Sequence, residues 1–257
     1  NNYNNYGLDQ LQKLPSFNGV CELNFKDSIF YMLNVSGDDA VVLKYLWRNS
    51  YEKLSLSYWY EITREDGICL DIGAHTGIYS IIGNLNKKTN DVISIEPYFI
   101  NFSRLLTNLK LNNIPTKNCI LGAASKEKGF EKFYVLQDPS YHTAGGKLSS
   151  NGNFNVTKIK IDDLKFKKKI TGIKIDTEGH ELEVLIGGED HIKNDNPDII
   201  LEINNNCFDS CLSFLKQFSY NFYFIDEKNN NIKKIDSLDN IELASEGLNC
   251  LVTKRRL

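Results

Sequence analysis

Two stretches of the sequence combine residue types that can bind a nucleotide-like ligand and move a proton. The first, residues 69–80, is an apolar run that leads into Asp71, Gly73 and Gly77. Glycine lets backbone N–H groups approach a ligand closely, and a helix starting behind the glycines adds partial positive charge. Glu96 follows Asp71 by about 25 residues, near the roughly 20 that separate a glycine loop from a ribose-binding carboxylate. The spacing predicts a site for a ribose-containing cofactor.

The second stretch, residues 174–181, gathers carboxylates and an imidazole. Asp176 closes an apolar run and is expected at the carboxyl end of a buried strand, which in an open α/β sheet faces the ligand crevice. A helix N-terminus favours acidic residues in any protein, and this explains Glu178 by itself but not Asp176. His180 has a reference pKa of about 6.5, which suits proton transfer near neutral pH. We therefore predict that Asp176, Glu178 or His180 accepts a proton from a substrate or orients that substrate.

The elements that hold these stretches alternate between strand and helix from residue 67 onward. This alternation predicts an α/β protein with a doubly wound, mostly parallel sheet. The expected strands are 67–72, 91–96, 118–124, 172–176 and 199–203, with extra strands at 130–136 and 155–161, helices near 77–86, 98–112 and 207–218, and closing strands 220–226 and 248–253 that pair with each other.

The residues before this alternation form a lead segment. Two short strands are expected within 18–36 and helical structure over 38–64, after a polar tail of about 15 residues. We therefore divide the chain into a tail and lead segment, 1–66, and a main domain, 67–257. A long loop, 138–154, interrupts the main domain, and loops of this length are often functional.

Composition narrows the class of protein. The 257 residues are 41% hydrophobic, enough for one large α/β domain, and the net charge of −3 disfavours a nucleic-acid backbone as the main partner. The six cysteines form no Cys-x-x-Cys pair, so we expect reduced thiols and a cytoplasmic protein. No apolar run reaches the length of a membrane span.

The pattern Asp-x-Gly-x-x-x-Gly with a later acidic strand end resembles the first two motifs of class I S-adenosylmethionine methyltransferases. With the Lys-x-Asp-x-Glu-Gly-x-Glu stretch that starts at Lys174, the chain resembles the FkbM family of these enzymes. His75 departs from the pattern, because the family often has asparagine there and many class I enzymes have glycine. The matching segments are 51–52, 70–77, 95–97, 161–164, 173–182 with Leu185 and Gly187, and 197–202.

The resemblance implies a Rossmann-like sheet with an antiparallel closing strand and methyl transfer from S-adenosylmethionine to a hydroxyl of a sugar, glycan or related metabolite. It also implies roles on the cofactor side. Glu96 would bind the ribose, and Ala123 would lie beside the adenine. The amino-acid part of the cofactor would lie on the glycine loop, at Asp71, Gly73, Ala74, His75 and Gly77.

Three alternatives remain open. Asp176, Glu178 and Glu202 are oxygen ligands that Mg²⁺ accepts, so a metal-assisted O-methyltransferase is possible, although we assign no metal ligand. A dinucleotide oxidoreductase lacks support because the middle glycine is missing, and a non-catalytic nucleotide-binding module does not explain the carboxylates. A nucleic-acid amino-methyltransferase would carry Asn/Asp-Pro-Pro-Tyr/Phe where this chain has 176–179. We expect a small-molecule or glycan acceptor, no nucleic acid, and specificity in the lead segment and the 138–154 loop.

Overall fold

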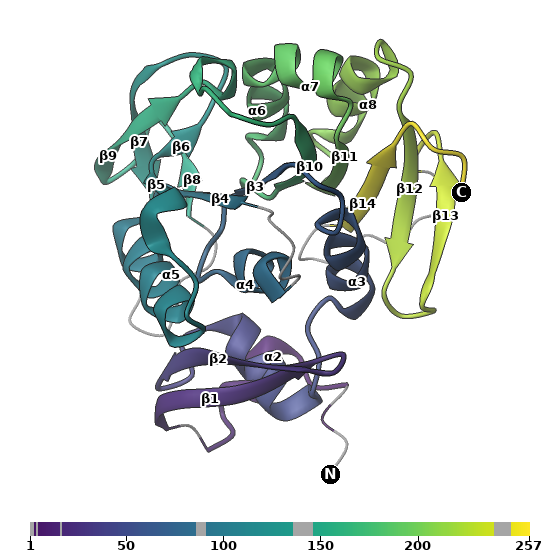
Figure 1. Cartoon of the computed structure of the whole chain (residues 1–257). Coiled ribbons are helices and arrows are strands. Elements are labelled where there is room, and N and C mark those ends of the chain that lie inside the picture. The colour runs from purple at the N-terminus through teal and green to yellow at the C-terminus, as the bar shows by residue number, and fades with distance from the viewer. Residues whose placement is uncertain (1–2, 4, 16, 86–90, 136–145, 239–247) are drawn as a thin grey trace.

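A central sheet organises the chain in the computed structural model, which describes residues 3, 5–15, 17–85, 91–135, 146–238 and 248–257 (Figure 1). Among these residues the sheet has eight strands, of which the first five in spatial order are parallel and β14 is antiparallel to both of its neighbours. The predicted doubly wound sheet with an antiparallel closing strand is confirmed. The order is β5 (Cys119–Leu121), β4 (Asp91–Glu96), β3 (Ile68–Ile72), β10 (Ile170–Ile175), β11 (Asp198–Ile203), β14 (Leu248–Thr253), β12 (Asn221–Asp226) and β13 (Asn231–Ile235).

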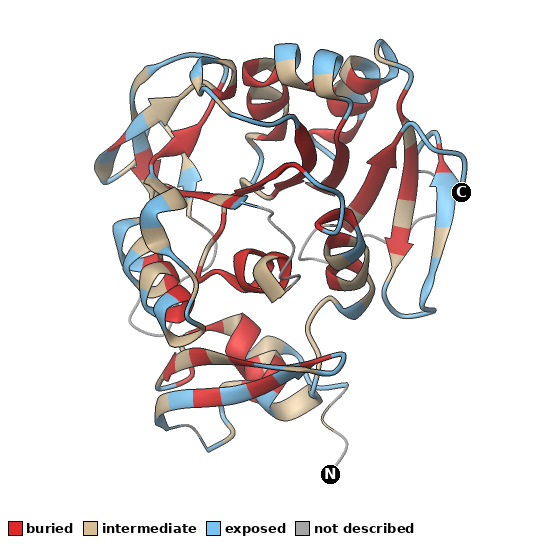
Figure 2. Ribbon diagram, viewed as in Figure 1, coloured by how far each residue is buried: buried red, intermediate tan, exposed pale blue. Residues whose placement is uncertain are grey.

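The two middle strands are buried along their whole length. Every residue of β3 and β10 is buried, as expected for parallel strands covered on both faces (Figure 2). Ile175 pairs with Ile72 in register, so both strands end at the same edge of the sheet. This register brings the two polar stretches of the sequence together.

Helices cover both faces of the sheet (Figure 1). One face carries α6 (Glu181–Gly187), α7 (Glu189–Asp195) and α8 (Phe208–Lys216), and the other carries α3 (Lys53–Ile62), α4 (Ile78–Leu85) and α5 (Phe99–Leu111). Trp59 of α3 is fully buried, and its indole N–H donates to the carbonyl of Tyr79 in α4 at 2.8 Å. The lead segment is thus fastened to the helix that follows the glycine loop.

The lead segment forms the hairpin β1 (Asn18–Phe25) and β2 (Ser28–Val35), then α2 (Ala40–Arg48) and α3. The two strands and the helical structure over 38–64 were expected. The helical region is divided into two helices, because α2 ends where Asn49 adopts a left-handed conformation, which asparagine tolerates. Side chains of α5 tie the hairpin down, because Asn112 and Asn108 accept from the backbone N–H groups of Tyr31 and Leu33, each at 2.8 Å. The tail also contributes α1 (Leu8–Leu11). The division at residue 66 stays a prediction, since the segment shares a hydrophobic core with α4 and α5.

A second, small sheet stands beside β5 and contains β6 (Ala123–Ala124), β9 (Phe154–Ile159), β7 (Gly129–Tyr134) and β8 (Lys147–Leu148). The extra strands expected near 130–136 and 155–161 are β7 and β9. The single strand expected over 118–124 is wrong, because the chain leaves the central sheet at Gly122 and β6 pairs with β9. A Cβ atom at Gly122 would lie 2.6 Å from Ile159 Cδ1, so the crossing needs glycine. Of the predicted functional loop, residues 138–145 lie outside the described residues.

The closing strands β12 and β14 pair antiparallel as predicted, while α7, β8 and β13 were not predicted. In the described parts of the chain, no helix combines the length and the apolar character that crossing a bilayer requires. All six cysteines are free thiols.

Candidate active site

The glycine loop, residues 73–77, turns at the carboxyl end of β3. Gly73 has φ +76°, and a Cβ atom added there would lie 1.7 Å from the backbone oxygen of Asp176. The N–H of Asp176 donates to the carbonyl of Ile72 at 3.0 Å, and that of Gly73 donates to Ile95 at 2.9 Å. The main chain of Asp176 is therefore fixed against the glycine loop.

Glu96 holds the loop from the next strand. Its Oε2 accepts from the backbone N–H of His75 at 2.9 Å, and its Oε1 accepts from that of Tyr98 at 2.8 Å. The side chain is buried, and this burial raises the pKa of Glu96 to about 8 even though the two N–H donors favour the ionised form. The Asn101 side chain also donates to this carboxyl, and the acceptor site that then remains could take a hydroxyl of a ribose.

His75, where the sequence departs from the family pattern, has φ +51°. This left-handed region is one that asparagine and glycine enter most easily, which explains the residue types usual at this position. Its Nε2 is buried and has no hydrogen-bond partner among the residues that the structure describes. A buried ring nitrogen without a partner is the feature expected where a ligand supplies the missing contact.

Asp71 lies behind the loop rather than on its surface. It is 1% exposed and accepts from the hydroxyl of Ser80 at 2.5 Å. Burial raises the pKa of Asp71 to about 6, and the Ser80 hydroxyl partly offsets this effect. The loop closes with the N–H of Gly77 donating to Ala74 at 2.8 Å. Asp71 thus fixes the start of α4, and its predicted contact with the cofactor stays a prediction.

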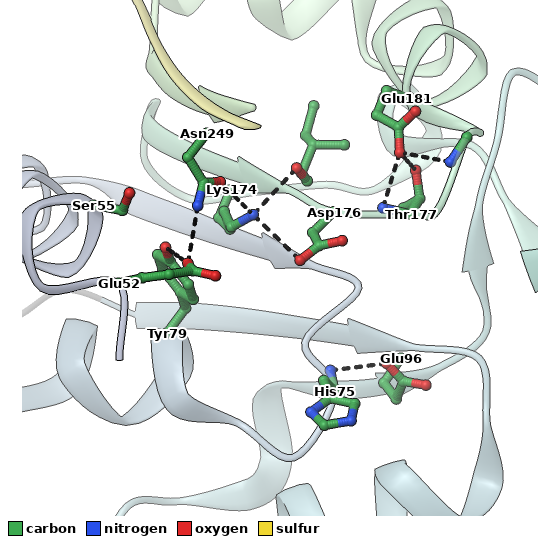
Figure 3. A network of polar contacts seen from close by, with 12 residues as sticks. Glu52, Ser55, His75, Tyr79, Glu96, Lys174, Asp176, Thr177, Glu181 and Asn249 are labelled. Carbon is green, nitrogen blue, oxygen red and sulfur yellow. Dashed lines mark hydrogen bonds and ion pairs between the residues drawn. The ribbon is translucent and has the colours of Figure 1, made fainter. Parts of the chain in front are cut away.

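Opposite the loop, five residues form what we call the Lys174 network: Glu52, Tyr79, Lys174, Asp176 and Asn249 (Figure 3). The Lys174 ammonium is 2% exposed and lies 3.5 Å from Asp176 Oδ2 and 3.3 Å from Asn249 Oδ1. Glu52 Oε2 accepts from the Tyr79 hydroxyl at 2.5 Å and from the Asn249 amide at 3.0 Å. A buried cation is thereby held between carboxylates from distant parts of the chain.

Glu202, at the end of β11, joins this network through a hydrogen bond to Asp176. Burial and the neighbouring Asp176 raise the pKa of Glu202 well above its usual range. Burial also acts to raise the pKa of Asp176, but Lys174 and the bond from Glu202 outweigh it and the pKa is lowered. A proton shared by the two carboxyls is therefore favoured on Glu202 over Asp176.

The loop after Asp176 is shaped by Glu181, which is 2% exposed. Its Oε1 accepts from the N–H and the hydroxyl of Thr177, both at 3.1 Å, and from the N–H of Gly179 at 3.0 Å. Glu178 is exposed and has φ +56°. Glu181 therefore has a structural part in this stretch, while Glu178 lies at the surface of the site.

His180 turns toward the small sheet. Its Nε2 lies 3.0 Å from the hydroxyl of Ser125, and burial lowers its pKa, so the imidazole is neutral at pH 7. Ala123, nearby in β6, is buried in an apolar cluster. An open pocket of about 420 Å³ lies beside it, bordered by Pro97 and Gly122, which follow the ends of β4 and β5.

The structure brings Asp176 to the glycine loop and sends His180 toward β6, a difference that spacing in the sequence does not reveal. Sequence reasoning also missed Glu52, Tyr79, Lys174 and Asn249 as members of the site. Lys174 carried a signal, because a charged residue inside a buried strand needs partners. Glu52 lies in the matching segment 51–52 but was given no role, and Asn249 lies far from either stretch and carried no signal.

The site does not present a preformed metal centre. Over the described residues, no group of three or more histidine, cysteine or acidic side chains is arranged to hold a metal ion. The Lys174 ammonium takes the central position between Asp176 and Glu52 instead.

Comparison with known proteins gives the family. The model of the methyltransferase FkbM domain matches residues 71–222, more than half of the chain. This chain belongs to the FkbM methyltransferase family. The match spans the glycine loop, Glu96 and the Asp176 stretch, and it confirms the predicted methyltransferase. No curated protein matches the chain.

Solved structures of several methyltransferases are similar to part of this chain. The FkbM methyltransferase from Methylobacillus flagellatus KT is 18% identical, with a TM-score of 0.47, and the alignment covers 85% of this chain and 54% of that protein. This chain thus spans about half the length of that relative. Precorrin-6y C5,15-methyltransferase from Geobacter metallireducens GS-15 is 14% identical, with a TM-score of 0.46 and coverages of 77% and 86%. The Pyrococcus abyssi tRNA (uracil-54, C5)-methyltransferase in complex with S-adenosyl-L-homocysteine is 11% identical, with a TM-score of 0.48 and coverages of 91% and 43%.

Proposed function

We propose that this FkbM-family protein transfers a methyl group from S-adenosylmethionine to a hydroxyl oxygen of a sugar, glycan or related metabolite. The observation that carries the proposal is the contact between Gly73 and the main chain of Asp176. It fixes a carboxylate beside the loop that is suited to the cofactor. Methyl transfer to a hydroxyl needs that proximity, because positioning of donor, acceptor and base supplies much of the rate.

The residues on the loop side fit the cofactor. S-adenosylmethionine, when bound, supplies an electrophilic methyl group on a sulfonium, and its ribose carries two hydroxyls. Glu96 has lone pairs for the ribose, and the unpartnered Nε2 of His75 supports a ligand contact at the loop. In this proposal the amino-acid part lies on Asp71, Gly73, Ala74, His75 and Gly77, and the adenine lies near Ala123.

On the acceptor side, Asp176 takes the proton from the acceptor hydroxyl, since a neutral alcohol is a poor nucleophile. Its lowered pKa keeps it ionised at neutral pH, and the raised pKa of Glu202 favours a proton on Glu202 rather than on Asp176. Glu178 and His180 would orient the acceptor from the rim of the site. His180 is poorly placed as the base, because its Nε2 already pairs with Ser125.

Charge supports an acceptor without phosphate. Glu52 and Asp176 face a single cation, Lys174, and they would repel a phosphate group brought close to them. A neutral substrate rich in hydroxyls avoids this cost, and its hydroxyls can donate to the carboxylates of the site. The same argument disfavours nucleic acid. A cytoplasmic location stays a prediction from the free thiols.

Two other functions find less support. The metal-assisted route would need Asp176, Glu178 and Glu202 to converge on Mg²⁺. It is disfavoured because Asp176 is already paired with the Lys174 ammonium and Glu178 is exposed. The family match favours methyl transfer over hydride transfer.

Calorimetry with S-adenosylmethionine tests the cofactor side. Glu96→Ala removes the carboxylate that we assign to the ribose and should weaken binding at least about tenfold, the effect of losing roughly 1.4 kcal/mol. Glu61→Ala, which removes a surface ion pair with Lys26, is the matched control and should bind normally. Equal affinities for Glu96→Ala and the wild type would remove the ribose assignment.

A screen for release of S-adenosylhomocysteine tests the acceptor side. Neutral oligosaccharides, sugar nucleotides and an RNA transcript are offered in parallel to the wild-type protein. We expect turnover with neutral hydroxylated acceptors. Turnover with the RNA alone would contradict the proposed acceptor class.

A further inference from the structure

The backbone of Glu52 is strained, and its side chain does not cap the helix that follows it. It occupies the N-cap position of α3 with φ +38° and ψ 51°, a left-handed conformation that costs a non-glycine residue free energy. An N-cap residue normally turns its side chain back to the first N–H groups of the helix, but Glu52 makes no such bond. The strain therefore has to be explained by what the side chain does elsewhere.

The helix is capped by a different glutamate. Glu227, which follows β12, accepts from the N–H groups of Leu54 and Ser55 at 2.8 and 2.7 Å, and from the Ser55 hydroxyl at 2.7 Å. The N-terminus of α3 is thus satisfied from outside. Glu52 is left to reach into the site.

The side chain of Glu52 is connected to Asp176 through Asn249 and Lys174. It accepts from Asn249 Nδ2 at 3.0 Å, and the oxygen of the same amide lies 3.3 Å from Lys174 Nζ. Lys174 in turn lies 3.5 Å from Asp176 (Figure 3). The amide of Asn249 therefore binds the Glu52 carboxylate with its nitrogen and the Lys174 ammonium with its oxygen, and so fixes the two groups relative to each other.

We propose that Glu52 is a positioning residue for the proton-accepting carboxyls: through Asn249 it holds Lys174 in place, and its negative charge favours the shared proton on Glu202. This inference rests on the proposed function, because it takes Asp176 as the proton acceptor. It also makes the lead segment part of the active site. The titratable groups that act on the Asp176–Glu202 pair come from several elements: Tyr51 and Glu52 ahead of α3, Asp71 of β3, His75 of the glycine loop and Lys174 of β10. Tyr79 of α4 and Asn249 of β14 bind Glu52 instead.

The test follows the titration of Glu202 directly. Protein labelled with ¹³C at the glutamate side-chain carboxyls is titrated by NMR, and the Glu202 signal is identified by its absence in Glu202→Gln. In Glu52→Gln the midpoint should move to lower pH, because a negative charge that opposes ionisation of Glu202 has been removed. Glu52→Asp keeps the charge on a shorter side chain and should give a midpoint between the two.

Glu227→Gln is the matched control. It weakens the cap of the same helix and should lower the melting temperature while leaving the Glu202 midpoint where it is in the wild type. A midpoint that does not move in Glu52→Gln, or that moves equally in Glu227→Gln, overturns the inference. If Glu52→Gln does not fold, the comparison of Glu52→Asp with the wild type decides in the same way.

The readout separates this inference from the proposed function. The titration needs neither cofactor nor acceptor, so an unmoved midpoint leaves methyl transfer intact. Conversely, a wild-type protein that methylates no hydroxyl in the acceptor screen would end the proposed function even if the midpoint moves as expected.

Discussion

Replacing Gly73 by alanine tests whether the contact between the glycine loop and Asp176 holds the site together. An alanine there must keep φ near +76° and place its Cβ 1.7 Å from the Asp176 carbonyl oxygen, a distance that two non-bonded heavy atoms cannot hold. The backbone has to move, and the loop or the end of β10 moves with it. We expect loss of stability together with loss of cofactor binding.

Gly179 supplies the matched control for this variant. It also has positive φ, +104°, but a Cβ added there would meet nothing within 4 Å. Gly179→Ala should therefore suffer only the left-handed strain, about 1–2 kcal/mol. Gly73→Ala adds the steric conflict, worth about 1–3 kcal/mol in well-packed surroundings, for a total of about 2–5 kcal/mol.

Urea unfolding of the two variants and the wild type measures this difference, and calorimetry with S-adenosylmethionine follows the site. We expect Gly73→Ala to lose more stability than Gly179→Ala and to bind the cofactor more weakly. Equal losses of stability in the two variants would refute the reasoning, because they would show that the close approach of Asp176 contributes nothing.

Three further predictions concern protons and metal. In the wild type, Glu96 opposes stability increasingly between pH 5 and pH 8, because its folded-state pKa of about 8 lies above the ordinary 4.5 and the folded state keeps a proton that the unfolded state has released. Thermal melts at pH 5 and pH 8 should show that stability depends less on pH in Glu96→Gln than in the wild type. An equal dependence of stability on pH in the two proteins would contradict this. The imidazole of His180 should titrate below its ordinary 6.5 by NMR because it is buried, whereas a midpoint at or above that value would speak against a neutral His180. Methyl transfer to any acceptor found in the screen should survive exhaustive chelation, and activity lost to chelator and restored by Mg²⁺ would favour the metal-assisted route.

Much of the fold follows from local patterns. Continuous apolar runs such as those of β3 and β10 predicted buried strands, and the alternation of strands and helices predicted a parallel sheet. The failures have local causes that only packing exposes. Gly122 separates β5 from β6 because the chain must pass close to Ile159. The expected helical region 38–64 is divided into two helices where Asn49 and Glu52 take left-handed conformations, a detail that the apolar pattern did not reveal.

The sequence by itself determined the glycine loop, the acidic residue after the next strand and the carboxylates after β10, because each depends on residue type and short spacing. These were enough to indicate the family. The strand register then places Asp176 against Gly73, a consequence of the neighbouring positions of β3 and β10 in the sheet.

Only the tertiary structure decided which charges meet in the site. Glu52, Lys174 and Asn249 are separated by more than seventy residues at each step along the chain, and no local pattern links them. A buried ammonium must be paired wherever the fold leaves it, so its partners are chosen by long-range packing rather than by sequence neighbours. The same packing turns His180 toward Ser125 and leaves Asp176 beside the glycine loop.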